Sequence, residues 1–349
     1  MDYTLITGGA GYIGSNICIE LYKYTQKIIV VDNYSNSFKH IETRVKKYAP
    51  KIIFLECNLL DKQLLIGIFL TYKISSVIHL AGLKCINESI INPLLYYSNN
   101  ITSTLNLLNI MEEFKCYNLI FSSSASVYGN QNIAPIHETA ITSGKPENPY
   151  AYSKLFIETI LKDISINPKW KIIILRYFNP VGCHSTALIG EMSKNIPSNL
   201  FPYIIGVYSG QYPYLNIFGN NYDTKDGTCI RDYIHVEDLA RAHVCALDKI
   251  IKSKILKINI YNIGTGIGYS VLDIVNCFDK YCDKPIKRKI CDKRPGDVAI
   301  CYADNKKALS ELNWTPIYTL DKMVCDSLLW ANQLNNVSDT SNYHGDGHS

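Results

Sequence analysis

The sequence predicts an α/β protein with a doubly wound parallel sheet and a smaller, mostly C-terminal α/β domain. Three observations support this fold class. Short β-branched runs alternate with helical patterns through the first half of the 349-residue chain, as in parallel sheets covered by helices on both faces. A glycine-rich turn, TGGAGYIGS, follows the first run at residues 7–15. From Pro180 to Thr228 the alternation loosens, and Gly, Pro, Asn and Tyr become frequent.

The expected strands are short apolar runs, and each leads into a turn or a helical pattern. We expect strands at residues 3–7, 28–32, 52–56, 76–82, 118–124 and 171–178, and a returning strand at 257–264. We expect helices at 12–24, 64–72, 93–113, 149–164, 273–282 and 306–312. Strands that alternate with helices form parallel pairs, so the first-half strands predict a single sheet.

The composition argues against several classes of function. The 35 Lys and Arg against 31 Asp and Glu leave a net charge of +4, and the chain has no long basic run, so we expect no nucleic-acid partner. No apolar run approaches the roughly 18 residues of a membrane span, and no signal peptide precedes the first strand. The 12 cysteines lack metal-type spacing, which predicts reduced thiols in a cytoplasmic protein without a metal site.

The turn after the first strand has the glycine spacing of a dinucleotide-binding site. Gly8, Gly11 and Gly14 recur every three residues, and Gly9 with the last two fits G-x-G-x-x-G. Such glycines permit a tight turn and the close approach of a pyrophosphate to a helix N-terminus. Asp32 ends the second strand, where a carboxylate binds the ribose 2′-hydroxyl and repels a 2′-phosphate. The pattern predicts a Rossmann domain that prefers NAD to NADP.

Ser124, Tyr150 and Lys154 form a predicted proton-transfer site. Ser124 ends the fifth strand, at the sheet edge where ligands bind, and Tyr150 and Lys154 share one helix face at i and i+4. We expect the Lys154 ammonium and a positive nicotinamide ring to lower the phenol's pKa from its usual value near 10. Tyr150 then takes a proton from a carbohydrate hydroxyl while the carbon gives a hydride to NAD. Tyr152 points away from this face and is expected to be structural.

Six motifs together resemble the extended short-chain dehydrogenase/reductase family and, within it, the UDP-glucose 4-epimerases. They are GGAGYIG, HLAGLK, SSSASVYG, PYAYSK, RYFNPVG and RDYIHVEDLA, and the resemblance runs from about residue 3 to 330. RYFNPVG with IFGNNYDTKDGTCIRDYIHV is more specific than the glycine turn, which many relatives share. The resemblance implies reversible, NAD-dependent epimerisation at C4 of UDP-glucose and UDP-galactose through a 4-keto intermediate. It also implies a homodimer.

The same resemblance implies two sets of binding residues, matched motif by motif. The expected NAD contacts are Gly8, Gly11, Tyr12, Ile13, Gly14, Asp32, Asn33, Asn36, Ser37, Asn58, Leu59, Leu80, Ala81, Gly82, Lys84, Asn99, Ser124, Tyr150, Lys154 and Phe178. The expected UDP-sugar contacts are Lys84, Ser124, Tyr150, Phe178, Asn179, Asn199, Leu200, Asn216, Phe218, Arg231, Arg294, Asp297 and Cys301. Phe218 is expected beside the uracil and Asp297 at the uridine ribose. Arg231 and Arg294 supply planar guanidinium groups suited to a diphosphate.

Each set contains one departure from the family's usual pattern. Asn58 stands where members usually carry Asp near the adenine, and its amide still forms hydrogen bonds. Cys301 stands where members restricted to UDP-glucose and UDP-galactose usually carry Tyr. Members that also convert N-acetylated sugars have a small residue there, and overpacking a pocket costs roughly 1–3 kcal/mol. Cys301 therefore predicts activity on UDP-GlcNAc and UDP-GalNAc, unless a neighbour such as Tyr302 fills the space.

Two other functions stay open from the sequence. A nucleotide-sugar 4,6-dehydratase shares the fold and the Tyr–Lys pair, but it needs an acidic pair after Ser124, where this chain has Ala125 and Ser126. A non-catalytic NAD-sensing protein can lose the catalytic tyrosine, which is present here. Absorbance in the nicotinamide band, with and without a UDP-sugar, separates a sensor from an enzyme.

The predicted domains are discontinuous in sequence. Residues 1–178 with about 229–263 form the expected NAD-binding domain. Residues 179–228 with about 264–335 form the expected UDP-sugar-binding domain. The polar tail at 336–349 is expected to be disordered.

Overall fold

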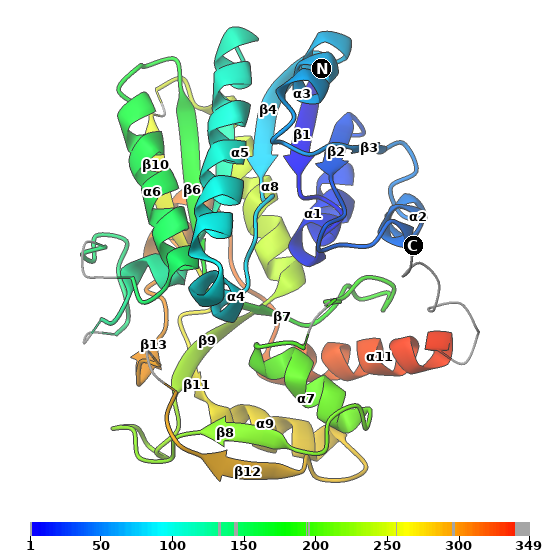
Figure 1. Cartoon of the computed structure of the whole chain (residues 1–349), viewed down its shortest axis with the longest axis vertical. Coiled ribbons are helices and arrows are strands. Elements are labelled where there is room, and N and C mark those ends of the chain that lie inside the picture. Colours follow the sequence, from blue (N-terminus) through cyan, green and yellow to red (C-terminus); the bar gives the residue numbers. More distant parts are fainter. Residues whose placement is uncertain are drawn as a thin grey trace.

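Parallel strands form the central layer of the larger domain (Figure 1). The computed structural model describes residues 2–131, 134–142, 146–192, 194, 196–255, 257–294 and 297–338. The seven-stranded sheet has the order β10-β6-β5-β4-β1-β2-β3. Its strands are β1 (Tyr3–Thr7), β2 (Ile28–Asp32), β3 (Ile53–Glu56), β4 (Ile74–His79), β5 (Asn118–Ser124), β6 (Lys171–Tyr177) and β10 (Ile258–Ile263). The predicted doubly wound parallel sheet is confirmed.

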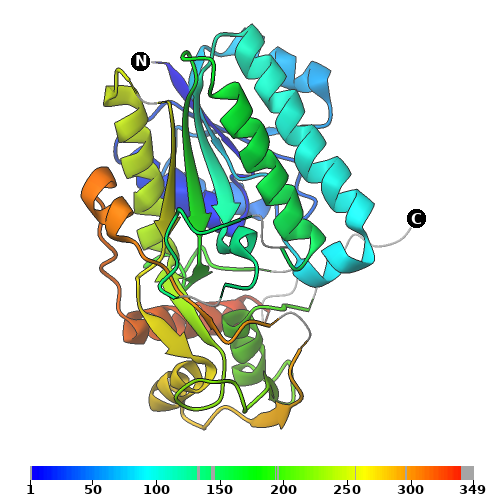
Figure 2. The ribbon, with the colours of Figure 1, turned by 90° about the vertical axis from the view of Figure 1, so that its left-hand side faces the viewer.

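Helices cover both faces of this sheet because its strands are apolar on both sides. Every residue of β2, IIVVD, is buried, as expected for a strand with helices above and below. One face packs against α1 (Tyr12–Tyr22), α2 (His40–Lys46) and α8 (Val236–Lys252). The other packs against α3 (Lys62–Thr71), α5 (Pro93–Glu113) and α6 (Pro149–Ile164). Figure 2 shows α8 on one side of the strands and α5 and α6 on the other.

The order of the strands places a crevice at one edge of the sheet. From β1 the chain goes to β2 and β3 on one side, then crosses back to β4 and β5 on the other. The connections after β1 and β4 therefore separate at the carboxyl ends of these strands, where open α/β sheets bind ligands. Short helices α4 (Ile86–Ile91) and η1 (Ala125–Tyr128) lie close to this edge in sequence, after β4 and β5.

The smaller domain lies beyond this edge and has its own core (Figure 1). One sheet contains β7 (Asn179–Val181), β9 (Ile230–His235), β11 (Gly268–Ser270) and β13 (Ile300–Cys301), and a second pairs β8 (Leu215–Phe218) with β12 (Arg288–Cys291). Helices α7 (Leu200–Tyr208), α9 (Val271–Tyr281) and α11 (Leu320–Ser338) pack against these strands, while α10 (Lys306–Leu312) packs on α8 and β10. Among the described residues, no helix is both long and apolar enough to cross a membrane.

Two boundaries differ from the sequence-based division. The segment 229–263 was expected in the larger domain, but β9 lies in the smaller sheet because it pairs with β7 and β11. The tail was expected to begin at residue 336, whereas α11 continues to Ser338. Met323, Val324 and Trp330 anchor this helix in buried positions. Residues 339–349 lie outside the described part of the chain.

Candidate active site

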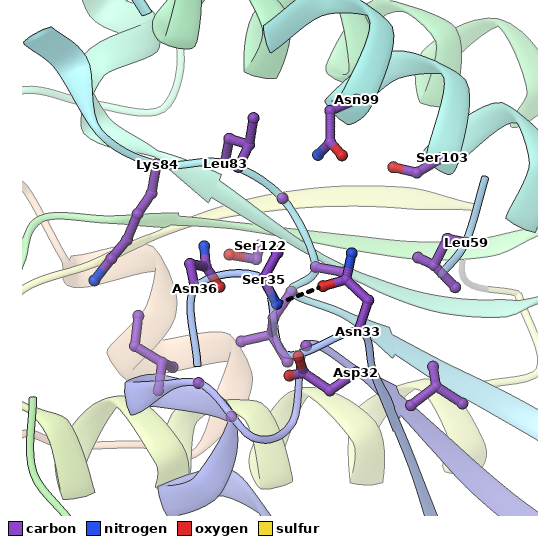
Figure 3. A pocket seen from close by; sticks show the side chains of 18 of the residues that line it. Asp32, Asn33, Ser35, Asn36, Leu59, Leu83, Lys84, Asn99, Ser103 and Ser122 are labelled. Atoms are coloured by element: carbon purple, nitrogen blue, oxygen red, sulfur yellow. Dashed lines mark hydrogen bonds between the residues drawn. The ribbon is translucent and has the colours of Figure 1, made fainter. Parts of the chain in front are cut away.

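A cavity opens at the crevice between the carboxyl ends of β1 and β4. It holds about 1150 Å³ of empty space, including solvent at its mouth. In Figure 3, Asn99 and Ser103 of α5 lie on one side of the cavity, and Asp32 and Asn33 lie on the other. The expected NAD contacts that line it are Gly8, Gly11, Tyr12, Ile13, Gly14, Asp32, Asn33, Asn36, Asn58, Leu59, Leu80, Ala81, Gly82, Lys84, Asn99, Tyr150 and Lys154.

The glycine turn forms a cradle that side chains cannot occupy. Gly8 has φ of +71°, and a Cβ there would lie 2.7 Å from the backbone nitrogen of Ala81. A Cβ on Gly14 would lie 2.4 Å from the Gly8 carbonyl oxygen. Because α1 begins directly after this turn, its N-terminal N–H groups and helix dipole face the crevice. The turn therefore fits the pyrophosphate of a dinucleotide.

The Asp32 carboxylate is fixed by hydrogen bonds from three directions. Its oxygens accept from the backbone N–H of Ala10 at 3.0 Å and of Tyr34 at 2.9 Å, and from the Ser37 hydroxyl at 2.9 Å. A carboxylate has about four lone-pair positions, so a further hydroxyl donor can still bind. Ser37 orients Asp32 and does not line the cavity. The site thus fits the ribose diol of an unphosphorylated dinucleotide.

The Tyr150–Lys154 pair enters the cavity from the first two turns of α6. Asn148 caps this helix by accepting from the Ala151 N–H at 2.9 Å, and Pro149 occupies the first helical position. Lys154 is 5% exposed, and its ammonium donates to the Ser122 carbonyl at 2.7 Å. Burial lowers the pKa of Lys154 to about 8, against an opposing effect of Glu158. The cavity therefore holds a lysine that titrates close to neutral pH.

The pKa of Tyr150 differs from the sequence-based expectation of a lowered value. Burial raises it above 10, and the effects that oppose burial are a hydrogen bond with Ser124 and the charge of Lys84. The Lys154 ammonium, which donates to the Ser122 carbonyl, is not among these effects. In the protein without bound NAD, burial outweighs the effects that favour the phenolate, because a phenol enclosed by protein is desolvated. A cationic ligand group beside the phenol acts in the opposite direction to burial.

Lys84 and Ser124 meet Tyr150 from outside α6. Lys84 follows β4, and its ammonium lies 2.9 Å from the carboxylate of Glu191 in the segment after β7. The Ser124 hydroxyl accepts from the Ser126 N–H at 3.2 Å and from the Ser126 hydroxyl at 2.9 Å. Ser124 is therefore held at the end of β5 by the next turn of chain, next to the phenol that it contacts.

A second group of polar side chains lies on the smaller domain. The Arg294 guanidinium stacks on the Phe218 ring at 4.3 Å, and its Nε donates to Asp297 at 3.1 Å. Arg231 of β9 approaches the same carboxylate at 3.8 Å. Asp232, which the sequence offered as an alternative partner for Arg231, instead accepts from Thr265, Gly266 and Ala303. Two cations, an aromatic face and a carboxylate thus converge from three segments.

The remaining expected substrate contacts lie on the smaller domain and have partners within the protein. Asn179 donates to the Asp232 carbonyl at 2.7 Å, Asn199 precedes α7 as its cap residue, and Leu200 begins that helix. Asn216 of β8 accepts from the Cys291 thiol at 3.3 Å. The cavity described above does not include these side chains.

Phe178 and Cys301 share a small apolar cluster at the domain boundary. Phe178 is buried with Val127, Tyr128 and Ile136, and Cys301 packs against the same cluster. Cys301 pairs with Arg231 in parallel register, so both side chains project from the same face of the sheet. Tyr302 points elsewhere, since its ring lies against the position of Gly268.

Several cavity-lining residues were not anticipated from the sequence. They are Val31, Ser35, Cys57, Leu83, Ser103, Ser122, Tyr177 and Met192. Most follow directly from the sheet, since they neighbour expected residues at strand ends. Met192 has no such signal, because it reaches the cavity from the segment after β7, which the smaller domain supplies.

Fold and site together define the class of protein. A glycine turn after β1, a carboxylate ending β2 and a Tyr–Lys pair on α6 form the arrangement of a short-chain dehydrogenase/reductase, with an added domain that carries two arginines. The chain belongs to the NAD dependent epimerase/dehydratase family, which it matches over residues 4–264.

Known proteins of this family resemble the chain over nearly its whole length. UDP-glucose 4-epimerase of Pasteurella multocida is 48% identical over 328 residues, which cover 93% of this chain and 96% of that protein. The human UDP-glucose 4-epimerase is 44% identical and covers 95% and 97%. The crystal structure of UDP-glucose 4-epimerase from Bifidobacterium longum in complex with NAD+ and UDP superposes with a TM-score of 0.91, at 44% identity and coverages of 96% and 99%.

Proposed function

We propose that this chain interconverts UDP-glucose and UDP-galactose by NAD-dependent epimerisation at C4. The observation that supports this most strongly is that Tyr150 and Lys154 line the same cavity as the glycine turn and Asp32. A proton acceptor therefore lies beside the position of a dinucleotide. The relatives at 43–48% identity are named as UDP-glucose 4-epimerases, one of them as a bifunctional UDP-glucose and UDP-xylose 4-epimerase.

The protein's own groups account for binding of the cofactor. Gly8 and Gly14 admit the pyrophosphate, Asp32 binds the adenosine ribose, and Asn58 lines the adenine end, where its side-chain oxygen also accepts from the Leu60 N–H at 3.0 Å. When bound, NAD supplies a hydride acceptor and donor for C4 of the sugar. Tyr150, Lys154 and Ser122 close the cavity at its reacting end.

Proton transfer is the task of Tyr150. Its phenolate accepts the proton of the sugar 4-hydroxyl and returns it after the ring has turned over. Ser124 donates a hydrogen bond that favours the phenolate, and Lys84 adds a positive charge. Lys154 contributes a second cation from one turn further along α6. The proton moves along one hydrogen bond between the sugar 4-hydroxyl and Tyr150, and the three neighbouring groups favour the phenolate that accepts it.

The smaller domain anchors the nucleotide and leaves the sugar free. Arg231 and Arg294 bind the diphosphate, Phe218 contacts the uracil, and Asp297 accepts from the uridine ribose. In binding, the arginines exchange part of their contact with Asp297 for phosphate oxygens. Anchoring at the UDP end permits a 4-keto sugar to rotate and to present its other face.

The substrate range extends to N-acetylated sugars. Cys301 lies beside Arg231 on the shared sheet face and packs against Phe178. A side chain of this size leaves more room for an acetamido group at C2 than a tyrosine at the same position would. The chain therefore also interconverts UDP-GlcNAc and UDP-GalNAc.

The functional unit is a homodimer in the cytoplasm. Large apolar side chains are exposed on three helices next to the cavity, among them Ile91, Leu94, Leu95 and Phe156, with exposed fractions of 76%, 78%, 48% and 45%. They lie on α4, α5 and α6, three helices that pack against one another, and large apolar side chains exposed together in this way mark a protein interface. Two copies related by a two-fold axis bury it with the same residues on both sides.

The test of the proposed function is incubation of the purified chain with UDP-galactose, followed by separation of the sugar nucleotides. Formation of UDP-glucose supports it. Formation of a 4-keto-6-deoxy sugar would instead indicate the dehydratase, which the Ala125 and Ser126 following Ser124 disfavour. Bound NAD that is never reduced by any UDP-sugar would indicate a sensor.

A further inference from the structure

A buried ion pair lies one helical turn beyond Lys154, and the reaction proposed above does not use it. Glu158 of α6 and Arg176 of β6 have side chains that are 0% and 1% exposed. Their contact is bidentate: Nε donates to Oε1 at 2.9 Å, and Nη2 donates to Oε2 at 2.6 Å. The Ser123 hydroxyl donates to the same carboxylate at 2.6 Å. Such a geometry fixes the carboxylate in one place.

The position of this carboxylate relative to Lys154 follows from the helix and the sheet. Lys154 and Glu158 are i and i+4 on α6, so their side chains are neighbours on one face. Ser123 and Arg176 are paired residues of β5 and β6. Lys154 donates to the carbonyl of Ser122, one residue before that pair. The ammonium and the ion pair are therefore held by consecutive residues of the same strand.

Among the described residues, the groups that face Lys154 from the neighbouring elements carry no negative charge. On β4, His79 bonds to Thr7 and Thr104, and its pKa is lowered to about 3 by burial and by Lys154, so it is neutral. On β5, the Phe121 ring lies 4.9 Å from the ammonium. On α6, the phenol of Tyr150 is protonated in the resting site. On β6, the Tyr177 hydroxyl bonds to His243.

Arg176 holds Glu158 in place and is itself fixed by two further contacts. Its guanidinium donates to the Glu138 carbonyl at 3.2 Å and stacks on the Tyr128 ring at 4.7 Å. Both ends of the pair are thus immobilised, with the negative end adjacent to Lys154 along the helix.

We propose that Glu158, fixed by Arg176 and Ser123, is a positioning residue that holds Lys154 in its charged form at the Tyr150 end of the cavity. This inference rests on the proposed function, in which a cationic Lys154 assists proton transfer to Tyr150. It assigns to a buried ion pair a role in the pH range of the reaction. Burial disfavours the Lys154 charge, and Glu158 opposes burial.

The test compares Glu158→Gln, the double variant Glu158→Gln/Arg176→Met and the control Ser123→Ala in the full-length chain. The control perturbs the same contact and keeps both charges. The readout is the pH dependence of trace acetylation of Lys154 by acetic anhydride, located by mass spectrometry, since only the free amine reacts. The alkaline limb of kcat on UDP-galactose is measured in parallel.

The charges predict a definite order of effects. In Glu158→Gln the Arg176 charge is left uncompensated, and the midpoint of Lys154 labelling falls by about two pH units for a charge one helical turn away at an effective dielectric constant of about 20. In the double variant the Arg176 charge is removed as well, and the fall is about one unit. The double variant leaves no uncompensated charge at the position of the ion pair, so it folds even where the single variant is too unstable. Ser123→Ala leaves the midpoint near the wild-type value.

Two results would overturn the inference. One is an unchanged labelling midpoint in both Glu158 variants with kcat lowered equally at every pH, which is the signature of a purely structural pair. The other is a shift in Ser123→Ala as large as that in Glu158→Gln. An unshifted midpoint in a chain that converts UDP-galactose counts against the role of Glu158 alone. A shifted midpoint in a chain that does not convert UDP-galactose counts against the proposed function alone.

Discussion

Replacing Lys154 by methionine is expected to stabilise the protein while it removes a group needed for the reaction. Lys154 is 5% exposed, and burial lowers its pKa from 10.5 to about 8. At 1.36 kcal/mol per pKa unit, the folded protein carries the charged amine at a cost of roughly 3 kcal/mol. Methionine fills a similar volume without this cost, but it loses the hydrogen bond to the Ser122 carbonyl, worth about 1 kcal/mol. The expected net gain is roughly 2 kcal/mol at pH 7.

The pH dependence gives this prediction its sign. The folded pKa is lower than the unfolded one, so between about pH 8 and 10.5 the unfolded chain holds a proton that the folded protein has released. Wild-type stability therefore rises with pH through this window because the cost of the charge disappears. The Lys154→Met variant has no such contribution. The difference in free energy of unfolding between the two proteins is largest below pH 8 and shrinks as the pH approaches 10.5.

The assay is urea unfolding of nucleotide-free wild type and variant at pH 7 and pH 10, because a bound ligand adds its own stabilisation. Lys162→Met, an exposed lysine on the same helix, is the matched control and changes stability little at either pH. A Lys154→Met variant that is less stable than wild type at pH 7 would refute the reasoning. So would a stability difference that stays constant from pH 7 to pH 10.

Three further predictions concern the site itself. Tyr150→Phe lowers kcat by about 10²–10⁴-fold because the proton acceptor is lost, and it leaves NAD and UDP binding intact in a direct binding measurement. The control Tyr152→Phe has little effect on kcat. Near-normal turnover of Tyr150→Phe would contradict the assignment and point to Tyr152. Asp32→Asn narrows the preference for NAD over NADP in equilibrium binding, because it removes the charge that repels a 2′-phosphate, and equal affinity of wild type for both dinucleotides would show that Asp32 does not contact the ribose. Cys301→Tyr abolishes conversion of UDP-GlcNAc and keeps that of UDP-galactose, since the ring fills space beside Arg231 and overpacking costs roughly 1–3 kcal/mol; wild type without activity on UDP-GlcNAc would contradict the assignment.

The larger domain was predictable because its elements have local causes. The β-branched strand at 28–32 and the proline-started helices at 93–113 and 149–164 appear with the predicted bounds. The glycine turn was readable for the same reason, since Gly8 and Gly14 meet backbone atoms that exclude any side chain. Helix α8 was not among the expected elements, although its buried residues recur at helical spacing, as at Leu239, Ala242, Ala246 and Ile250.

The smaller domain was less predictable because its strands are short and pair across long sequence distances. β13 is two residues long and pairs with β9, which lies some 70 residues earlier in the chain, so no local sequence pattern predicts this strand. The same long-range pairing moved β9 out of the domain to which the sequence assigned it. Two residues of the segment after β7 also make contacts that are distant in sequence: Met192 lines the cavity, and Glu191 forms an ion pair with Lys84. The pKa of Tyr150 depends on burial by the whole site, which spacing within one helix does not report.

The most direct test of the account is the fate of the hydrogen at C4. UDP-galactose labelled with deuterium at C4 is incubated with the purified chain and NAD in ordinary water, and the UDP-glucose formed is analysed by mass spectrometry and NMR. A hydride that leaves C4 and returns within the closed site stays with its sugar. The account therefore predicts UDP-glucose that retains deuterium at C4 and carries no hydrogen from the solvent at that carbon. Product with the label washed out into solvent, or no product while Tyr150 is intact, would contradict it.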